Sequence, residues 1–165
     1  QVRHCGTIGG SVAHAVPASD LPTVLVALDA QLVARGSGGE RTIAAGDFFT
    51  GFLESALDPA EILTEIRVPK LDGGGAYLKY NRRAQDWATV GVAAVRHGGA
   101  TKVALTNMAP IPIRAAGVEE ALSGAHTPVD QIERLFAMED HLVGEENKKK
   151  LASYIRAKVT AARLS

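Results

Sequence analysis

The sequence contains only one cysteine, Cys5, among its 165 residues. A single cysteine cannot form an internal disulfide, and it cannot supply the thiolate ligands of an iron–sulfur cluster or a structural zinc site. The five histidines show no metal-ligand spacing, and no Ser–His–Asp or Cys–His set stands out. The sequence therefore predicts no metal site and no catalytic side chain of its own. A cytoplasmic location is the default expectation.

Long apolar runs and an excess of charge of one sign are also missing. No stretch approaches the roughly 20 apolar residues needed to cross a bilayer, so no transmembrane segment is expected. Lysine plus arginine and aspartate plus glutamate are equal, at 18 each. Without a basic excess, nucleic acid is not expected as the main partner. Hydrophobic residues, at 46%, suffice for the packed core of one domain, or of one domain with a small appendage.

The feature that stands out is a pair of glycines shortly before a helix-start signal. Gly9 and Gly10 predict a tight turn, because glycine reaches backbone dihedrals barred to other residues. Ser19 or Asp20 can cap the helix that follows, with Pro22 in its first turn. Such a turn leaves unpaired N–H groups at a helix start, which suit a phosphate-bearing ligand. The alternative is a turn with a purely structural role.

The rest of the sequence predicts an α+β fold. A helix and a hairpin come first, a three-stranded meander follows, and helices end the chain. A glycine-rich segment over 70–75 is the candidate internal boundary. Helices are expected over 21–28, 115–122, 127–136 and 145–164, a short helical turn over 47–53, and strands over 31–35, 41–44, 62–68, 76–82, 89–96 and 102–108.

The string from Thr7 to Pro22 resembles the second flavin-binding motif of the FAD-carrying medium subunit of the molybdenum hydroxylases. It reads Thr-Ile-Gly-Gly-Ser and continues, two residues on, with His-Ala-Val-Pro-Ala-Ser-Asp-Leu-Pro. Further blocks at 61–69, 76–89 and 104–110 follow in the family's order, and the last two look most like the carbon monoxide dehydrogenase branch.

This resemblance implies a domain organisation. Residues 1–70 are expected to form the C-terminal part of a PCMH-type FAD-binding domain. Residues 76–165 are expected to form a small antiparallel three-stranded sheet with a helical bundle, like the C-terminal domain of carbon monoxide dehydrogenase flavoproteins. In this family an N-terminal subdomain with a pyrophosphate-binding loop precedes the motif, so the chain is expected to be the C-terminal portion of such a subunit.

The resemblance also implies the residues that contact FAD at the glycine motif. Asp20 matches a carboxylate that binds the adenosine or ribose part, although it could serve only as a helix cap. Val16 departs from the family, whose bacterial members usually carry an aspartate there. The backbone or hydroxyl contacts of the motif itself are expected at Thr7, Ile8, Gly9, Gly10 and Ser11.

Three further residues match family positions near the flavin ring. Leu63 would pack on the flavin, or else belong to the core of a strand. Lys79 would favour the anionic reduced ring, or else lie on a solvated strand face. Trp87, the only tryptophan, would stack on the isoalloxazine, or else serve as a core or interface aromatic.

The role implied for the chain is electron transfer. In this family a large molybdopterin subunit oxidises the substrate, and two [2Fe-2S] clusters in a small subunit pass electrons to FAD. The flavin then reduces a quinone or another acceptor, which allows peripheral association with the inner face of a membrane. A dimer of heterotrimers is expected, and aerobic carbon monoxide oxidation is the favoured process. The alternative is a non-catalytic assembly module that cannot bind FAD alone.

Overall fold

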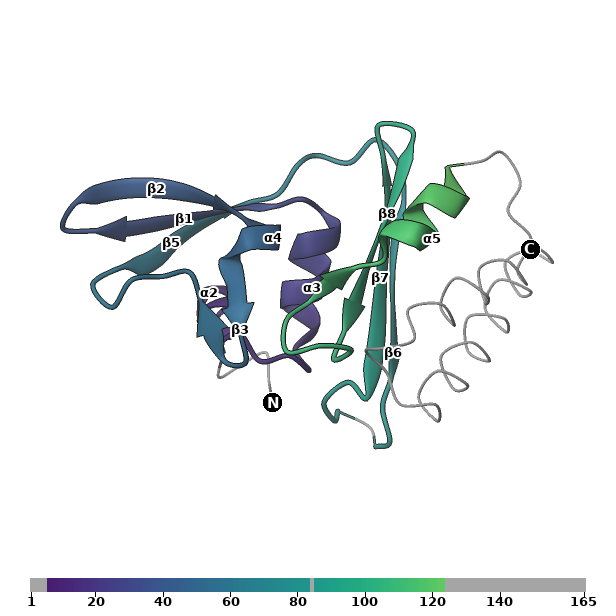
Figure 1. Cartoon of the computed structure of the whole chain (residues 1–165), viewed down its shortest axis with the longest axis horizontal. Helices are drawn as coiled ribbons and strands as arrows, with labels where there is room; N and C mark the ends of the chain where they lie inside the picture. Colours follow the sequence, from purple (N-terminus) through teal and green to yellow (C-terminus); the bar gives the residue numbers. More distant parts are fainter. Residues whose placement is uncertain (1–5, 84, 124–165) are drawn as a thin grey trace.

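The computed structural model describes residues 6–83 and 85–123, in which helix α3 lies between two β-sheets (Figure 1). The helices predicted over 127–136 and 145–164 lie outside the described residues. The described helices are α2 (Ile8–Ala13), α3 (Asp20–Ala27), α4 (Ala45–Phe48) and α5 (Ala116–Leu122). The strands are β1 (Gln31–Gly36), β2 (Gly39–Ala44), β3 (Phe49–Gly51), β4 (Glu54–Ser55), β5 (Ile62–Arg67), β6 (Gly75–Tyr80), β7 (Val90–His97), β8 (Ala100–Thr106) and β9 (Ile113–Arg114).

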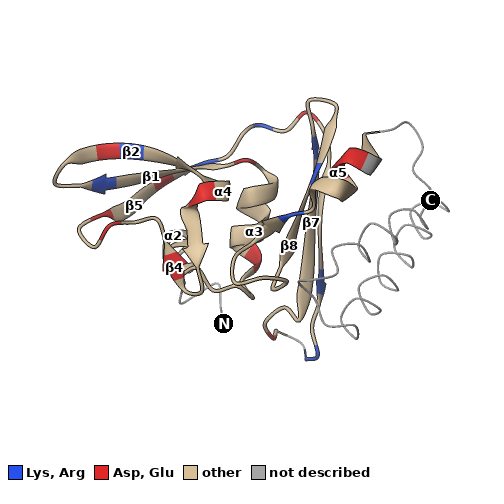
Figure 2. Ribbon diagram, in the orientation of Figure 1, with Lys and Arg blue, Asp and Glu red and all other residues tan. Residues whose placement is uncertain are grey.

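The first sheet is antiparallel and has the strand order β2-β1-β5. Strand β1 is central, and its residues Leu32, Val33 and Ala34 are all buried. Strand β2 is an edge strand on which only Ile43 is buried. The β1–β2 hairpin carries both signs of charge, and Arg35 forms an ion pair with Glu40 across it (Figure 2). All three strands lie where the sequence predicts them.

The helical turn predicted over 47–53 is wrong in part. Helix α4 ends at Phe48, and the chain continues as the β3–β4 hairpin. Phe48 and Phe49 are both buried and pack edge to face, with ring centroids 5.2 Å apart. Neighbouring side chains leave a helix about 100° apart, so a helix-to-strand junction buries two adjacent rings more readily than one continuous helix.

The second sheet has four antiparallel strands in the order β6-β7-β8-β9. The sequence predicts a three-stranded meander, which corresponds to β6, β7 and β8. Strand β9 was missed because its two residues, Ile113 and Arg114, are too few to show the period-2 pattern of a strand. The α+β class is confirmed.

The two faces of the second sheet pack against different helices. On one face, Ala93, Val95 and Ala104 share a buried cluster with Leu25 and Val26 of α3. The other face forms a separate cluster with Ala115 and Val118 at helix α5. The division of the chain into 1–70 and 76–165 stays a prediction, but the described residues of both parts contribute to one core.

A charged network also joins α3 to the second sheet. Asp29, just after α3, accepts hydrogen bonds from Lys102 and from Arg114 Nη1, the latter at 2.7 Å. Arg114 binds both oxygens of Glu119 at 2.6 and 2.8 Å, and Glu119 accepts the Val103 N–H at 2.7 Å. The network therefore fixes the C-terminal end of α3 relative to β8, β9 and α5.

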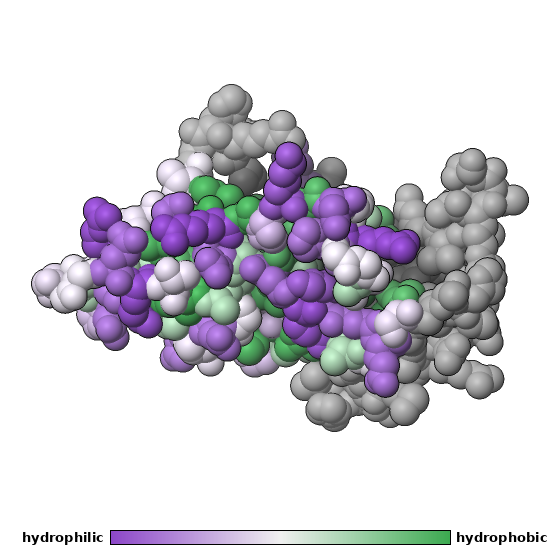
Figure 3. Space-filling view, turned by 90° about the horizontal axis from the view of Figure 1, so that it is seen from above, coloured by the Kyte–Doolittle hydropathy of each residue, from purple (hydrophilic) through white to green (hydrophobic). Residues whose placement is uncertain are grey.

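Seen from above, one face of the described residues shows many polar residues with apolar areas between them (Figure 3). Within 6–83 and 85–123, no helix has the length and apolar character that crossing a membrane requires.

Candidate functional site

The first residue of α3, Asp20, supplies the central carboxylate of the site. Neither Asp20 nor Ser19 caps the helix through its side chain, so the capping role expected for one of them is not observed. The Asp20 carboxylate accepts instead from the Tyr77 hydroxyl at 2.7 Å and from Lys79 Nζ at 3.0 Å. Both donors lie on β6, which pairs with β7, and β7 and β8 pack against α3. The carboxylate is thus engaged by long-range partners and not by its own helix.

Strand β6 positions Tyr77 and Lys79 on one face because alternate strand residues point the same way. Burial raises the pKa of the Tyr77 phenol well above its usual range, and the adjacent Asp20 carboxylate adds to the shift. Tyr77 is therefore protonated at neutral pH and donates a hydrogen bond to Asp20. Its oxygen also lies 3.0 Å from the Thr106 hydroxyl oxygen, which in turn lies 2.8 Å from the Thr23 hydroxyl oxygen.

A cavity of about 570 Å³ opens beside this ion pair. Trp87 lies at the cavity with 60% of its surface exposed, which leaves its ring free for contact with a ligand. Its backbone N–H donates to Asp86 Oδ1 at 2.9 Å within the loop, and Asn107 Nδ2 donates to the Ala88 carbonyl at 2.8 Å, which anchors the loop just after Trp87. The cavity is lined by Ser11, Ala18, Ser19, Asp20, Leu21, Lys79, Gln85, Asp86 and Trp87.

The structure therefore brings together four of the residues that the sequence predicts as contacts of FAD. They are Ser11, Asp20, Lys79 and Trp87, which come from α2, α3, β6 and the loop before β7. Tyr77 was not predicted as a site residue, although its spacing of two residues from Lys79 on a predicted strand was a usable signal. Asp86 was not predicted either, and the neighbouring Trp87 was the only hint of its position.

The glycine turn predicted at Gly9 and Gly10 is wrong, because both residues lie inside helix α2. Thr7 precedes this helix and its hydroxyl accepts the Gly10 N–H at 3.0 Å, as an N-cap does. Ile8 and Val12, four residues apart, follow helical spacing, and Val12 is fully buried. A capping threonine and a buried apolar position thus outweigh the low helix propensity of two glycines.

The other residues predicted to contact FAD at the motif do not line this cavity, and their contacts with FAD stay predictions. Thr7, Ile8, Gly9 and Gly10 are not among its lining residues. Leu63, on β5 opposite Ala34, packs partly buried against the core that includes α3. Its position matches the strand-core alternative, and its contact with FAD stays a prediction.

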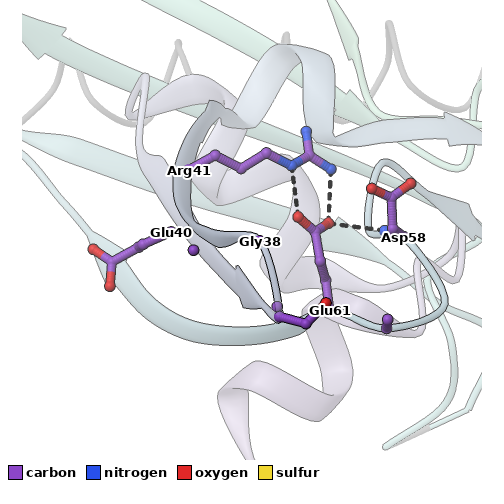
Figure 4. A pocket seen from close by; sticks show the side chains of 9 residues that line it. Gly38, Glu40, Arg41, Asp58 and Glu61 are labelled. Atoms are coloured by element: carbon purple, nitrogen blue, oxygen red, sulfur yellow. Dashed lines mark hydrogen bonds and ion pairs between the residues drawn. The ribbon is translucent and has the colours of Figure 1, made fainter.

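A second, smaller hollow of about 260 Å³ lies at the end of the β1–β2 hairpin. Figure 4 shows Arg41 and Glu61 facing each other there, with Glu40 directed away. Arg41 binds both Glu61 oxygens at 2.8 Å and the Ala56 carbonyl at 2.6 Å, and Glu61 also accepts the Asp58 N–H at 2.9 Å. Arg41 and Glu61 therefore form a structural ion pair at this hollow.

This ion pair predicts a specific loss of stability in acid. The bonds from Arg41 and from the Asp58 N–H lower the pKa of Glu61 to about 2. The unfolded chain takes up this proton near the ordinary value of 4.5, so the stabilisation is complete above that pH and is lost as the pH falls toward 2. We expect Glu61→Gln to be less stable at pH 6 and to lose less stability between pH 4.5 and 2. Urea unfolding at each pH measures both.

The matched control is Glu54→Gln, which changes an exposed carboxyl for which the described residues provide no ion pair. It should keep the steep acid loss of the unmodified protein. Equal acid slopes for Glu61→Gln and the unmodified protein would contradict the prediction.

Comparisons with known proteins identify the family of the chain. A family model described as the FAD binding domain in molybdopterin dehydrogenase matches residues 1–71. A second model, the CO dehydrogenase flavoprotein C-terminal domain, matches residues 75–150. The medium chain of carbon monoxide dehydrogenase from Hydrogenophaga pseudoflava is 43% identical over 131 residues, which are 75% of this chain and 46% of that protein. The glyceraldehyde dehydrogenase medium chain from Sulfolobus acidocaldarius is 34% identical, over 96% of this chain and 59% of that protein.

Solved structures show the same relationship. Carbon monoxide dehydrogenase from Hydrogenophaga pseudoflava matches with a TM-score of 0.81 at 37% identity, over 94% of this chain and 59% of that one. Quinoline 2-oxidoreductase from Pseudomonas putida matches with a TM-score of 0.84 at 26% identity, over 98% of this chain and 62% of that one. The chain belongs to the family of FAD-binding medium subunits of the molybdenum hydroxylases. It spans about half of the length of the curated relatives, between 46% and 59% in the examples given.

Proposed function

We propose that the chain forms the flavin-ring part of a FAD-carrying electron-transfer subunit in a carbon monoxide dehydrogenase-like oxidoreductase. The observation that carries the proposal is the convergence of Ser11, Asp20, Lys79 and Trp87 on one cavity, in a chain of the FAD-binding family. Residues from four separate segments meet there.

The chemistry of this residue set fits a flavin. The cavity, at about 570 Å³, has the size typical of a small-molecule site. The exposed Trp87 ring can stack on a flat aromatic ring, while Lys79, Asp20 and Ser11 offer a cation, an acceptor and a hydroxyl to its polar edge. When bound, FAD supplies the redox chemistry.

The roles of the residues follow from their contacts. Lys79 places a positive charge at the cavity, which favours a ring that carries negative charge after reduction. Asp20 holds Lys79 Nζ at 3.0 Å, so a flavin that meets one of these residues meets the other. The contact with Lys79 favours a place for Asp20 beside the ring, as an alternative to the contact with adenosine or ribose that the resemblance implies.

The wider assembly is part of the proposal. We infer that the subunit takes electrons from [2Fe-2S] clusters of a small subunit and passes them to a quinone or another acceptor. A large molybdopterin subunit would oxidise the substrate, with carbon monoxide as the favoured one because the carbon monoxide dehydrogenase medium chain is among the most similar relatives. A dimer of heterotrimers in the cytoplasm, in reach of a membrane quinone, completes this arrangement.

An absorption spectrum of the purified protein, with denaturing mass spectrometry on the same sample, tests the proposal. We expect a flavin band and the release of FAD on acid denaturation. A protein without flavin that also fails to take up added FAD would overturn the proposal. That outcome would favour the assembly module, whose role is to pack against partner chains.

A further inference from the structure

We propose that Tyr77 is a positioning residue for the flavin site and that Gly91 provides the space it needs. The inference rests on the proposed function and extends it to two residues outside the cavity lining. Tyr77 would act through Asp20, by holding the carboxylate that orients Lys79.

The two oxygens of the Asp20 carboxylate accept from two different donors. Tyr77 donates to Oδ1 at 2.7 Å, and Lys79 Nζ donates to Oδ2 at 3.0 Å. The Tyr77 bond fixes the rotation of the carboxylate, so Oδ2 stays directed at Lys79. Because Lys79 has a long, flexible side chain, this contact decides where its charge lies at the cavity.

Tyr77 is itself anchored by neighbouring side chains. Its hydroxyl oxygen lies 3.0 Å from the hydroxyl of Thr106, which is fully buried and contacts the Thr23 hydroxyl of α3. The partly buried Tyr77 phenol, with its raised pKa, remains a donor at all physiological pH values. The Asp20 carboxylate is 41% exposed. Without Tyr77, no hydrogen-bond donor among the described residues would restrain its Oδ1.

The neighbouring strand carries a glycine at the position where the Tyr77 hydroxyl needs space. Gly91 on β7 is paired with Lys79 on one side and with Thr106 on the other. A Cβ atom at Gly91 would overlap the Tyr77 hydroxyl and would lie 2.9 Å from Thr106 Oγ1. A glycine in the middle of a strand weakens the strand, and a close approach by another group is a recognised reason to keep one. Here the approaching group is the Tyr77 hydroxyl.

The test compares Tyr77→Phe with Tyr80→Phe in the purified flavoprotein. Tyr80 is on the same strand but packs against the other face of the sheet, so its variant removes a phenol hydroxyl away from Asp20. We expect Tyr77→Phe to weaken FAD binding about tenfold, as measured by titrating the apoprotein with FAD and following flavin fluorescence. It should also shift the flavin midpoint potential, whereas Tyr80→Phe should change neither quantity.

Gly91→Ala supplies an independent test, because it displaces the Tyr77 hydroxyl without removing it. We expect it to weaken FAD binding as Tyr77→Phe does, and to have no further effect on FAD binding when combined with Tyr77→Phe. Additive effects on FAD binding in this double variant would overturn the role given to Gly91.

A double-mutant cycle between Tyr77→Phe and Asp20→Ala, measured by thermal unfolding of the apoprotein, needs no flavin. Positioning through Asp20 predicts non-additive changes in melting temperature. Additive changes, or equal FAD binding by Tyr77→Phe and Tyr80→Phe, would overturn the inference. If the unmodified protein binds no FAD while the cycle shows coupling, the proposed function fails and the contact between Tyr77 and Asp20 still holds.

Discussion

Phe48→Ala is expected to lower the free energy of unfolding by about 3–5 kcal/mol, the largest stability change anticipated for a single substitution. Phe48 ends α4 and is completely buried, with Phe49 packed edge to face against it. Its removal deletes a large apolar group and leaves a cavity, because the surrounding side chains of the first sheet and α3 can relax only in part. Chemical unfolding monitored by circular dichroism measures the effect.

Phe52→Ala is the matched control for this prediction. Phe52 lies in the same hairpin region, but 66% of its surface is exposed. Exposed substitutions of this kind usually change stability by less than about 0.5 kcal/mol. Similar losses for Phe48→Ala and Phe52→Ala would show that the core is not centred on Phe48.

Asp20→Ala is expected to weaken FAD binding by about 10- to 100-fold. The substitution removes the acceptor of two hydrogen bonds, one from Tyr77 and one from Lys79. Bonds of this type to a charged group contribute about 1.5–3 kcal/mol each, and because Asp20 is partly exposed, the expected loss for the pair is discounted to about that of a single bond. Lys79 would lose its fixed position beside the cavity. Titration of the apoprotein with FAD measures the change.

Asp47→Ala controls for the helix itself. Asp47 lies in the first turn of α4, as Asp20 does in α3, so both variants lose an acidic group at a helix start. Asp47 does not line the cavity, and its removal should leave FAD binding unchanged. If the two variants bind FAD equally well, Asp20 has no role at the flavin beyond its helix.

Much of the candidate site could be read from the sequence, but with errors of local conformation. Ser11, Asp20, Lys79 and Trp87 were identified through the resemblance of their surrounding strings to a flavoprotein family. The conformation expected at Gly9 and Gly10 was nevertheless wrong, because a threonine cap and a buried valine stabilise a helix there. A pair of glycines indicates a backbone that can adopt several conformations, and tertiary packing determines which of them is adopted.

Other features were invisible to local patterns for a different reason. Tyr77 contacts Asp20, which is 57 residues away in the sequence. In the sequence, nothing distinguishes Gly91 from an ordinary strand residue. The structure shows that the Tyr77 hydroxyl lies against it. Such contacts depend on the register of β6, β7 and β8 and on the way α3 packs across them.

The sequence by itself determined the α+β class, most strand positions, the family and four of the residues that meet at the cavity. These follow from short-range properties, namely period-2 alternation, turn residues and motif strings. Only the tertiary structure decided that Asp20 binds Tyr77 and Lys79, that α4 passes directly into β3, and that the two predicted parts share a core. The physical reason is that side chains distant in the sequence compete for the same buried partners, and the outcome depends on the packing of the whole fold.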